Sequence, residues 1–212
     1  VAAMYLELGD HARAEPVIMR AISTAEAARA PYALHLARFN RGLVAAAAHD
    51  WERAEALIRE SLEAFIAQGD RRLEASARCA LAELRLARSD LRGARAEAEA
   101  ARTAAEGLGG SEAGACGVLA LALWQAGERD SAAHWAREGM RQRAGQPLEE
   151  RDELLRRMYA AALEHAGDAD GARALRAELE ADLQASAALI RDPALREAYT
   201  ALARAQSAGV RA

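Results

Sequence analysis

The chain has 212 residues, a net charge of −4, 52% apolar residues and 28% charged residues. This composition is that of a folded, soluble protein, and it excludes an intrinsically disordered chain. All of the basic residues are arginines, and they alternate with Asp and Glu, as over residues 85–97, which indicates solvated helix faces and argues against a basic surface for nucleic acid.

A turn at Gly9-Asp10 separates the first two predicted helices. The glycine ends a helix over residues 2–8, and the Asp10 side chain is placed to cap a second helix that runs to about Ala28. Pro16 falls inside this second helix, where it removes one hydrogen bond and predicts a bend.

The next two predicted pairs follow the same plan. Pro31 begins a helix that ends near residue 48, and His49-Asp50 forms the turn after it, with histidine in the place where glycine is expected. The predicted helices of this part cover residues 31–48, 51–68, 71–88 and 91–106.

The second half begins with a glycine-rich run at 107–110, which predicts a loop. Ser111 is placed to cap the helix that follows, and Asp192-Pro193 begins the last helix, with proline at its favoured first position. The predicted helices cover residues 112–126, 129–143, 148–166, 169–190 and 194–205, and the end from Gly209 is expected to fray.

The turns inside the predicted pairs share one two-residue sequence motif, the turn phrase, which ends in an acidic residue. An alanine follows four residues after this acidic residue. The five copies are Gly9-Asp10 with Ala14, His49-Asp50 with Ala54, Ser89-Asp90 with Ala94, Gly127-Glu128 with Ala132, and Gly167-Asp168 with Ala172. These alanines lie 40, 40, 38 and 40 residues apart, a period that indicates stacked units, each unable to bury its apolar face alone. We therefore predict a single all-α solenoid domain of five units, at about 1–29, 30–69, 70–109, 110–146 and 147–190, with a capping helix at 192–206.

Alanine supplies more than a quarter of the residues and aromatic residues only 4%, so the helices are expected to approach one another closely. We expect the alanine after each turn where two helices cross, since a bulkier side chain would push them apart. Cys79 and Cys116 fall at equivalent places in stacked pairs, about 10 Å apart, which is beyond the reach of a disulfide. We therefore expect both to be buried thiols in a reducing compartment. With no signal peptide and no long apolar run, the expected location is cytoplasmic.

The plan of each unit, an alanine- and leucine-rich helix, a Gly-Asp turn and an alanine four residues on, resembles the tetratricopeptide repeat. The match is best over residues 119–132, is nearly as good over residues 81–94, and covers about residues 1–190. The resemblance implies a right-handed superhelix in which the first helices of the pairs line a concave, ligand-holding face.

The period of about 40 residues is longer than the 34 usual in that family, and it is similar to that of MalT-type transcriptional regulators and related signal-transduction ATPases. The tail over residues 188–199 is similar to the ends of large bacterial regulators that join such repeats to an ATPase, kinase or cyclase module. Because the chain starts at Val1, partway through a unit, we expect it to be a C-terminal fragment of a longer protein.

The resemblance implies a non-catalytic module that binds a protein, a peptide or an upstream effector module of the same chain. The alternative is a sensor that holds a small molecule or a short signalling peptide in the concave groove. The sequence leaves the oligomeric state open.

The candidate binding residues are those placed on the concave face by this register. Trp124 leads them, because an exposed tryptophan in a groove is a common binding anchor, although it also suits the filling of space between units, the interpretation that we favour. Trp51 and Trp135 are expected to be structural. The full set is Phe39, Asn40, Leu43, Glu83, Leu86, Leu121, Trp124, Gln125, Arg157, Glu164 and His165.

Catalytic, cofactor and metal sites are not expected. The five histidines have no metal-ligand spacing with one another or with cysteine, and the sequence has no phosphate loop and no Gly-x-Ser-x-Gly motif. Asn40 matches one asparagine of the carboxylate-clamp members of the family, but Ser76 and Ala80 stand where the basic residues of the clamp belong. We therefore expect no clamp, no direct contact with nucleic acid and no membrane contact.

Overall fold

The computed structural model describes residues 1–144 and 151–209, with side chains in the last helix described as far as Ala203. The described part contains eleven helices, and the all-α prediction is confirmed. Their bounds are α1 Ala2–Glu7, α2 His11–Ala27, α3 Pro31–Ala47, α4 Trp51–Gln68, α5 Arg71–Ala87, α6 Leu91–Ala105, α7 Gly110–Gln125, α8 Arg129–Arg143, α9 Asp152–His165, α10 Ala169–Leu189 and α11 Pro193–Gly209.

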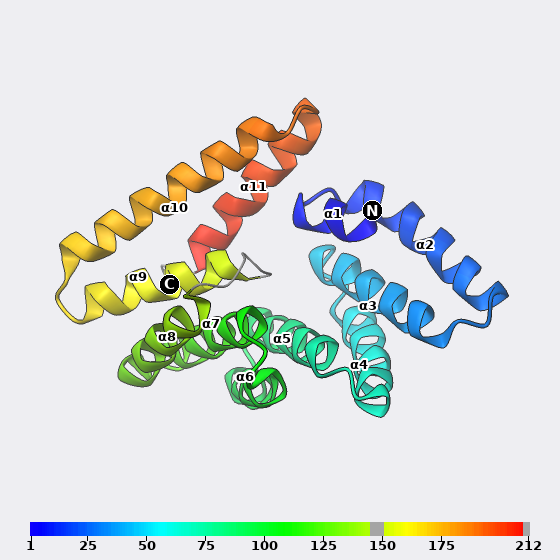
Figure 1. The fold of residues 1–212 in the computed structure, drawn as a ribbon, viewed down its shortest axis with the longest axis horizontal. Coiled ribbons are helices and arrows are strands. Elements are labelled where there is room, and N and C mark those ends of the chain that lie inside the picture. Colours follow the sequence, from blue (N-terminus) through cyan, green and yellow to red (C-terminus); the bar gives the residue numbers. More distant parts are fainter. Residues whose placement is uncertain (145–150, 210–212) are drawn as a thin grey trace.

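The helices pack in adjacent pairs, and each follows the previous one around an arc (Figure 1). The five pairs α1–α2, α3–α4, α5–α6, α7–α8 and α9–α10 are each joined by one copy of the turn phrase. The first helices of successive pairs also contact one another, from α1 through to α9. This arrangement is consistent with a helical repeat, in which each pair buries its apolar face against the next.

The acidic residue of the phrase caps the second helix of the pair in four of the five copies. In each of these, a carboxylate oxygen accepts a hydrogen bond from the backbone N–H three residues later, at 2.9–3.4 Å. Glu128, one methylene longer, makes no side-chain cap, and its carboxylate instead accepts a hydrogen bond from Arg95 Nη1 at 2.7 Å. The four capping residues are Asp10, Asp50, Asp90 and Asp168.

The residue before the acidic one takes a left-handed conformation in every copy. Gly9, Gly127 and Gly167 have φ angles of 74°, 83° and 86°, a region that glycine enters without steric penalty. His49 and Ser89 occupy the same place with φ angles of 59° and 61°. A side chain in this conformation costs roughly 1–2 kcal/mol, so these two turns store strain that the glycine turns avoid.

The alanine four residues after each acidic residue is buried, as predicted, with exposed fractions of 0–1% in all five copies. Glycines extend this close packing further along the array. A Cβ placed on Gly117 of α7 would lie 3.0 Å from the Leu155 Cα atom of α9, and one placed on Gly139 of α8 would lie 2.5 Å from Leu155 Cδ1. Small residues at these crossings therefore decide how closely the helices approach.

Larger apolar side chains fill the space between neighbouring pairs. Phe39 of α3 and Phe65 of α4 meet edge to face, with ring centroids 6.0 Å apart, in a cluster that also contains Leu81 of α5. Cys79 and Cys116 are both buried, in agreement with the sequence-based expectation.

The start of α7 differs from the prediction. Ser111 is not its cap, because the helix already begins at Gly110 and the cap position is taken by Gly109, with a φ angle of 57° and no side chain. The Glu112 carboxylate instead accepts a hydrogen bond from the Gly107 N–H at 2.9 Å. A carboxylate inside the first turn thus satisfies a backbone donor of the loop.

Two other helices also have revised bounds. Helix α9 begins at Asp152, directly after Arg151 with its left-handed φ angle of 69°, and the predicted start at residue 148 lies outside the described residues. Helix α11 begins at Pro193 and reaches Gly209, beyond the predicted end at 205. Helix α2 runs through Pro16 without a break.

The last helix lies beside the first turn of the array, inside the arc (Figure 1). Arg13 Nη1 is 2.7 Å from Asp192 Oδ2, the residue just before α11. A Cβ placed on Gly9 would lie 3.1 Å from the Ala198 carbonyl oxygen and 3.3 Å from Leu202 Cβ. The two ends of the array therefore meet through α11, which the repeat period alone does not predict.

Candidate functional site

The eleven predicted face residues lie on α3, α5, α7 and α9, the first helices of their pairs. Three of them are buried: Phe39, Leu86 and Arg157, with exposed fractions of 4%, 8% and 8%. Phe39 and Leu86 belong to two apolar clusters of the core. Their side chains hold neighbouring helices together, because each first helix packs on the pairs at both of its sides, and they are not open to a ligand.

Trp124 is half-buried at the meeting point of α7, α8 and α9. Trp124 and Leu121 pack against the core. The Arg129 guanidinium lies over the indole ring, 3.9 Å from its centroid, and the His165 ring meets the indole edge to face at 6.2 Å. His165 Nε2 is in turn 2.9 Å from Asp130 Oδ1. These contacts agree with the space-filling interpretation of Trp124.

Two acidic residues of the predicted face are held in ion pairs. Arg151 binds Glu83 with two nitrogens, at 2.8 and 3.1 Å, across 68 residues of chain. Glu164 of α9 pairs with Arg176 of α10. The two-point contact between Arg151 and Glu83 fixes the start of α9 against α5, because a bidentate guanidinium–carboxylate pair allows one relative orientation.

The remaining predicted residues are more accessible. Gln125 is exposed, and Asn40 and Leu43 are half-buried, with Leu43 packed against the cluster that contains Phe39. Ala80, at a place where a carboxylate clamp would need a basic residue, is buried. Glu164 and His165 are exposed as well, but they contact Arg176 and Asp130, so Gln125 is the exposed predicted residue that we consider first for a partner.

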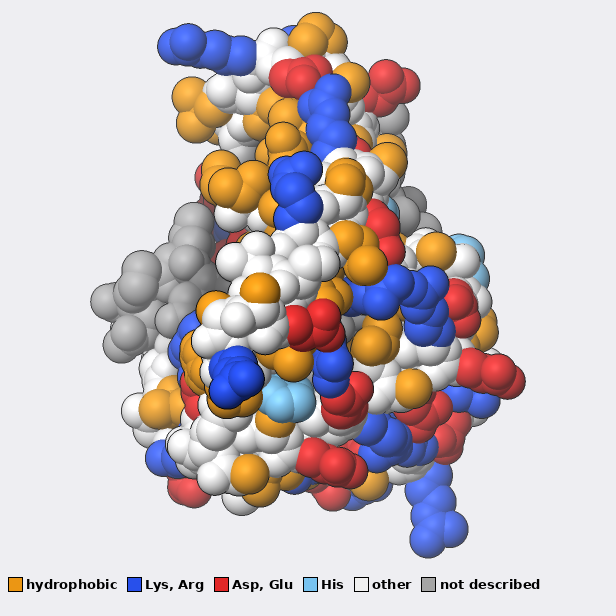
Figure 2. All heavy atoms as spheres, turned by 90° about the vertical axis from the view of Figure 1, so that its right-hand side faces the viewer, with side chains coloured by type: hydrophobic (Ala, Val, Ile, Leu, Met, Phe, Trp, Pro, Cys, Tyr) orange, Lys and Arg blue, Asp and Glu red, His pale blue; other side chains and the backbone are white. Residues whose placement is uncertain are grey.

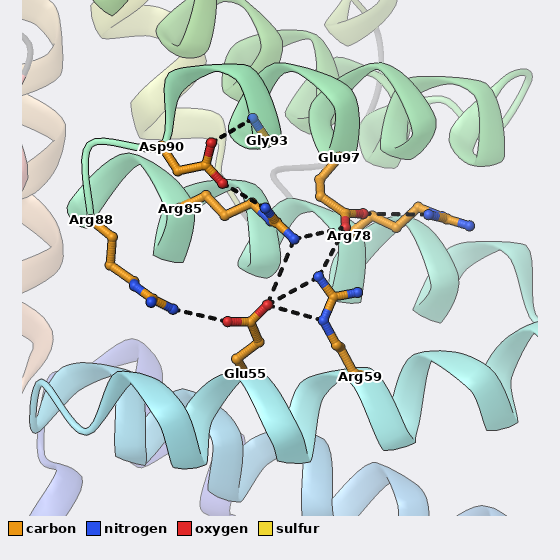
Figure 3. Close-up of polar contacts among 8 residues, drawn as sticks. All are labelled: Glu55, Arg59, Arg78, Arg85, Arg88, Asp90, Gly93 and Glu97. Carbon is orange, nitrogen blue, oxygen red and sulfur yellow. Dashed lines mark hydrogen bonds and ion pairs between the residues drawn. The ribbon is translucent and has the colours of Figure 1, made fainter.

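A network of ion pairs at the junction of α4, α5 and α6 has no counterpart in the sequence-based predictions (Figure 3). Glu55 of α4 receives Arg88 at 2.9 Å, Arg59 at 3.0 Å and Arg85 at 3.6 Å. Glu97 of α6 lies within 3.4–4.0 Å of three arginines, from α4 and α5. The basic members are Arg59, Arg78, Arg85 and Arg88, and the acidic ones are Glu55, Glu74, Asp90 and Glu97.

One corner of this network is the cap of α6. The Asp90 carboxylate accepts the Gly93 N–H at 2.9 Å and the Arg85 guanidinium at 2.6 Å, and these two contacts hold the Asp90 pKa below its usual range. A Cβ on Gly93 would lie 2.2 Å from both Arg85 Nη1 and Asp90 Oδ2, so these two side-chain groups would have to shift to admit it. Because four guanidinium groups face four carboxylates, the network fastens two helix pairs together and leaves no surplus charge for a phosphate.

The Cys116 thiol is held in an unreactive state. Burial, with a smaller contribution from Glu112, raises the pKa of the Cys116 thiol to about 12, so the nucleophilic thiolate is scarce at neutral pH. Among residues 1–144 and 151–209, no three His, Cys, Asp or Glu side chains are grouped so that they would hold a metal ion.

The surface on the right-hand side of Figure 1 carries interspersed acidic and basic side chains, with apolar groups between them (Figure 2). This mixing matches the alternation of charges in the sequence and is typical of solvated helix faces. Over the same described residues, no helix combines the length and the apolar character that crossing a membrane requires.

The sequence does not reveal that five residues join the ends of the array: Gly9, Arg13, Asp192, Ala198 and Leu202. The Asp192-Pro193 pair gave a signal for a helix start, but nothing local in the sequence pairs Asp192 with Arg13. Comparison with known proteins adds no assignment, since no family model matches the chain and a search of the curated proteins finds no match.

Proposed function

We propose that this chain is a non-catalytic, tetratricopeptide-like module that binds a protein or peptide within a bacterial signalling or transcriptional regulator of the MalT-like type. In such a regulator it would act in the cytoplasm beside an ATPase, kinase or cyclase module. The observation that carries the proposal is the coincidence of five turn phrases with five successive helix pairs, each with a buried alanine at the same place. A stack of this kind offers an extended surface to a partner.

The side chains on the inner helices favour binding over catalysis. Several carboxylates there are held by arginines, as Glu83 is by Arg151, and catalysis instead needs a group free to exchange a proton or attack a substrate. Exposed Gln125 and half-buried Asn40 offer amide groups for hydrogen bonds to a peptide. Binding would act by changing the curvature of the array or by bridging neighbouring copies.

A photo-crosslinking amino acid placed at Gln125, in the bacterium that naturally makes this protein, tests the proposal. We expect a discrete crosslinked protein, identified by mass spectrometry, from Gln125 and not from Glu63, an exposed position on α4. If neither position captures a protein, while one metabolite stabilises the purified chain, the sensor function replaces this one. A ligand at 100 times its Kd adds about 2.7 kcal/mol to the free energy of unfolding.

A further inference from the structure

The last two helices of the array, α10 and α11, are embedded more weakly than its interior helices. Over residues 193–203, α11 buries one side chain, Ala203, and the preceding helix α10 buries two, Ala172 and Leu179. The interior helices α5 and α7 bury nine and twelve residues. Elements with few buried apolar contacts open at lower free energy than the core, so this end of the array opens more readily than its interior.

Three contacts position α11 against the rest of the array. At its start, Asp192 pairs with Arg13 at 2.7 Å. At its middle, the absence of a side chain on Gly9 lets the α11 backbone come close. Just beyond that point, the buried Arg157 donates a hydrogen bond to the Ala203 carbonyl oxygen at 2.9 Å. We call the surface formed by Gly9, Arg13 and Arg157 the α11 site.

The helix that occupies this site is amphipathic. Its half-buried apolar side chains are Leu195, Ala198, Tyr199 and Leu202, at the spacing of three and four residues that marks one helix face; Thr200 is half-buried as well, and Ala203 is buried. Its exposed side chains are Pro193, Ala194, Arg196, Glu197 and Ala201. This is the pattern by which an amphipathic helix binds a groove in another protein.

We propose that the α11 site is a docking site for an amphipathic helix of a partner protein, which takes the place of α11. The proposal rests on the proposed function and names the class of partner. From Asp192 to Ala203 the site spans about 16 Å of helix, or three turns. The partner helix therefore has an acidic residue at its N-terminal end that pairs with Arg13. It has aliphatic residues at the positions that correspond to Leu195 and Leu202, and a small residue facing Gly9.

In the intact chain, α11 competes with any free helix for the α11 site. Because α11 is attached to α10, its effective concentration at the site is about millimolar. A free helix of the same sequence competes poorly with α11 unless α11 is dislodged or the partner makes further contacts.

The test uses the full chain and a fluorescent peptide of residues 191–209, with binding followed by anisotropy. The double variant Leu195→Asp/Leu202→Asp places charges on the docked face of α11 and dislodges it. The matched control Ala194→Asp/Ala201→Asp adds the same two charges at exposed positions of the same helix. We expect the peptide to bind the dislodged chain at least about tenfold more tightly than the unmodified chain or the control, given the millimolar competitor that is removed. Equal affinities for the three chains, or no binding to a dislodged chain with native circular dichroism, would overturn the proposal.

Hydrogen exchange on the unmodified chain keeps the proposal testable if the double variant fails to fold. Excess peptide should speed amide exchange in α11 and leave the turn at Gly9 protected. Unchanged exchange of α11 up to the solubility limit of the peptide would contradict displacement.

Failure of this inference differs from failure of the proposed function. If Gln125 crosslinks a protein but the peptide binds no chain, the partner uses another part of the array. If neither result appears, the binding function itself is wrong.

Discussion

Arg13 and Asp192 are separated by 179 residues in the chain, and their side chains meet at 2.7 Å where α11 returns to the first turn. Hydrogen bonding to Arg13 is the main cause that lowers the pKa of Asp192. We expect Asp192→Asn to keep the cap of α11, since asparagine caps a helix as well as aspartate does, but to lose the charge pair. Both side chains are well exposed, so the expected effect is a small increase in amide exchange confined to α11. Added salt should produce the same change in the unmodified chain and not in the variant.

Ala94 lies at a crossing where its exposed fraction is 0%. Leucine at this position adds three carbon atoms to a filled space, so we expect Ala94→Leu to lower the free energy of unfolding by about 1–3 kcal/mol. Ala96, two residues on and exposed, is the control, and Ala96→Leu should change the free energy little. Urea denaturation of the two variants gives the comparison, and equal midpoints would show that the crossing has room to spare.

Gly117 of α7 allows the backbone of α9 to approach. Alanine gains about 1 kcal/mol of helix propensity over glycine, yet a methyl group here would meet Leu155 backbone and Cβ atoms at 3.0–3.2 Å, which cannot rotate away. We expect the second effect to prevail, with Gly117→Ala lowering the free energy of unfolding by about 1–2 kcal/mol. A rise in the thermal midpoint instead would mean that α7 and α9 separate easily.

Ser89 and Gly127 occupy the same place in two copies of the turn, with φ angles of 61° and 83°. Ser89→Gly should relieve the left-handed strain and raise the free energy of unfolding by about 0.5–1 kcal/mol after the entropic cost of glycine. The reverse change, Gly127→Ala, should lower it by about 1–2 kcal/mol. No atom lies within 4 Å of a Cβ at Gly127, so only the backbone conformation is being tested there. Effects of the same sign in both variants would contradict this account.

His11 is half-buried at the start of α2, and burial lowers its pKa from 6.5, with Asp10 acting in the opposite direction. Because its pKa is lower in the folded state than in the unfolded state, the unfolded chain takes up a proton first as the pH falls. The contribution of His11 to stability is therefore complete above pH 6.5 and declines as the pH falls below it. Urea midpoints at pH 7.5 and pH 5.5 should differ less in His11→Gln than in the unmodified chain, and an identical difference would exclude His11 as the cause.

Local chemistry made the repeated turns predictable from the sequence. Asp10 and Asp168 have only to reach a backbone N–H three residues away, and Ala54 needs only to be small where two helices cross. The prediction that Ser111 caps α7 was wrong because Gly109 adopts a backbone conformation that lets the helix start earlier. Glycine has no side chain, so the sequence does not show which conformation it adopts. The pairs Arg13–Asp192 and Arg151–Glu83 depend on how the whole array curves, which no local pattern encodes.

The ion-pair network around Glu55 and Glu97 gives one junction between units a set of matched charges that apolar packing does not supply. The alanine methyl groups are the same at every helix crossing, so apolar packing alone does not distinguish one helix pair from another. Arginines from α4 and α5 converge on Glu97 at one junction, and a shuffled array would leave these charges facing groups that do not match them. Exchanging this helix pair with another copy of the repeat would therefore remove the matched charges at the junction, even if every alanine were retained.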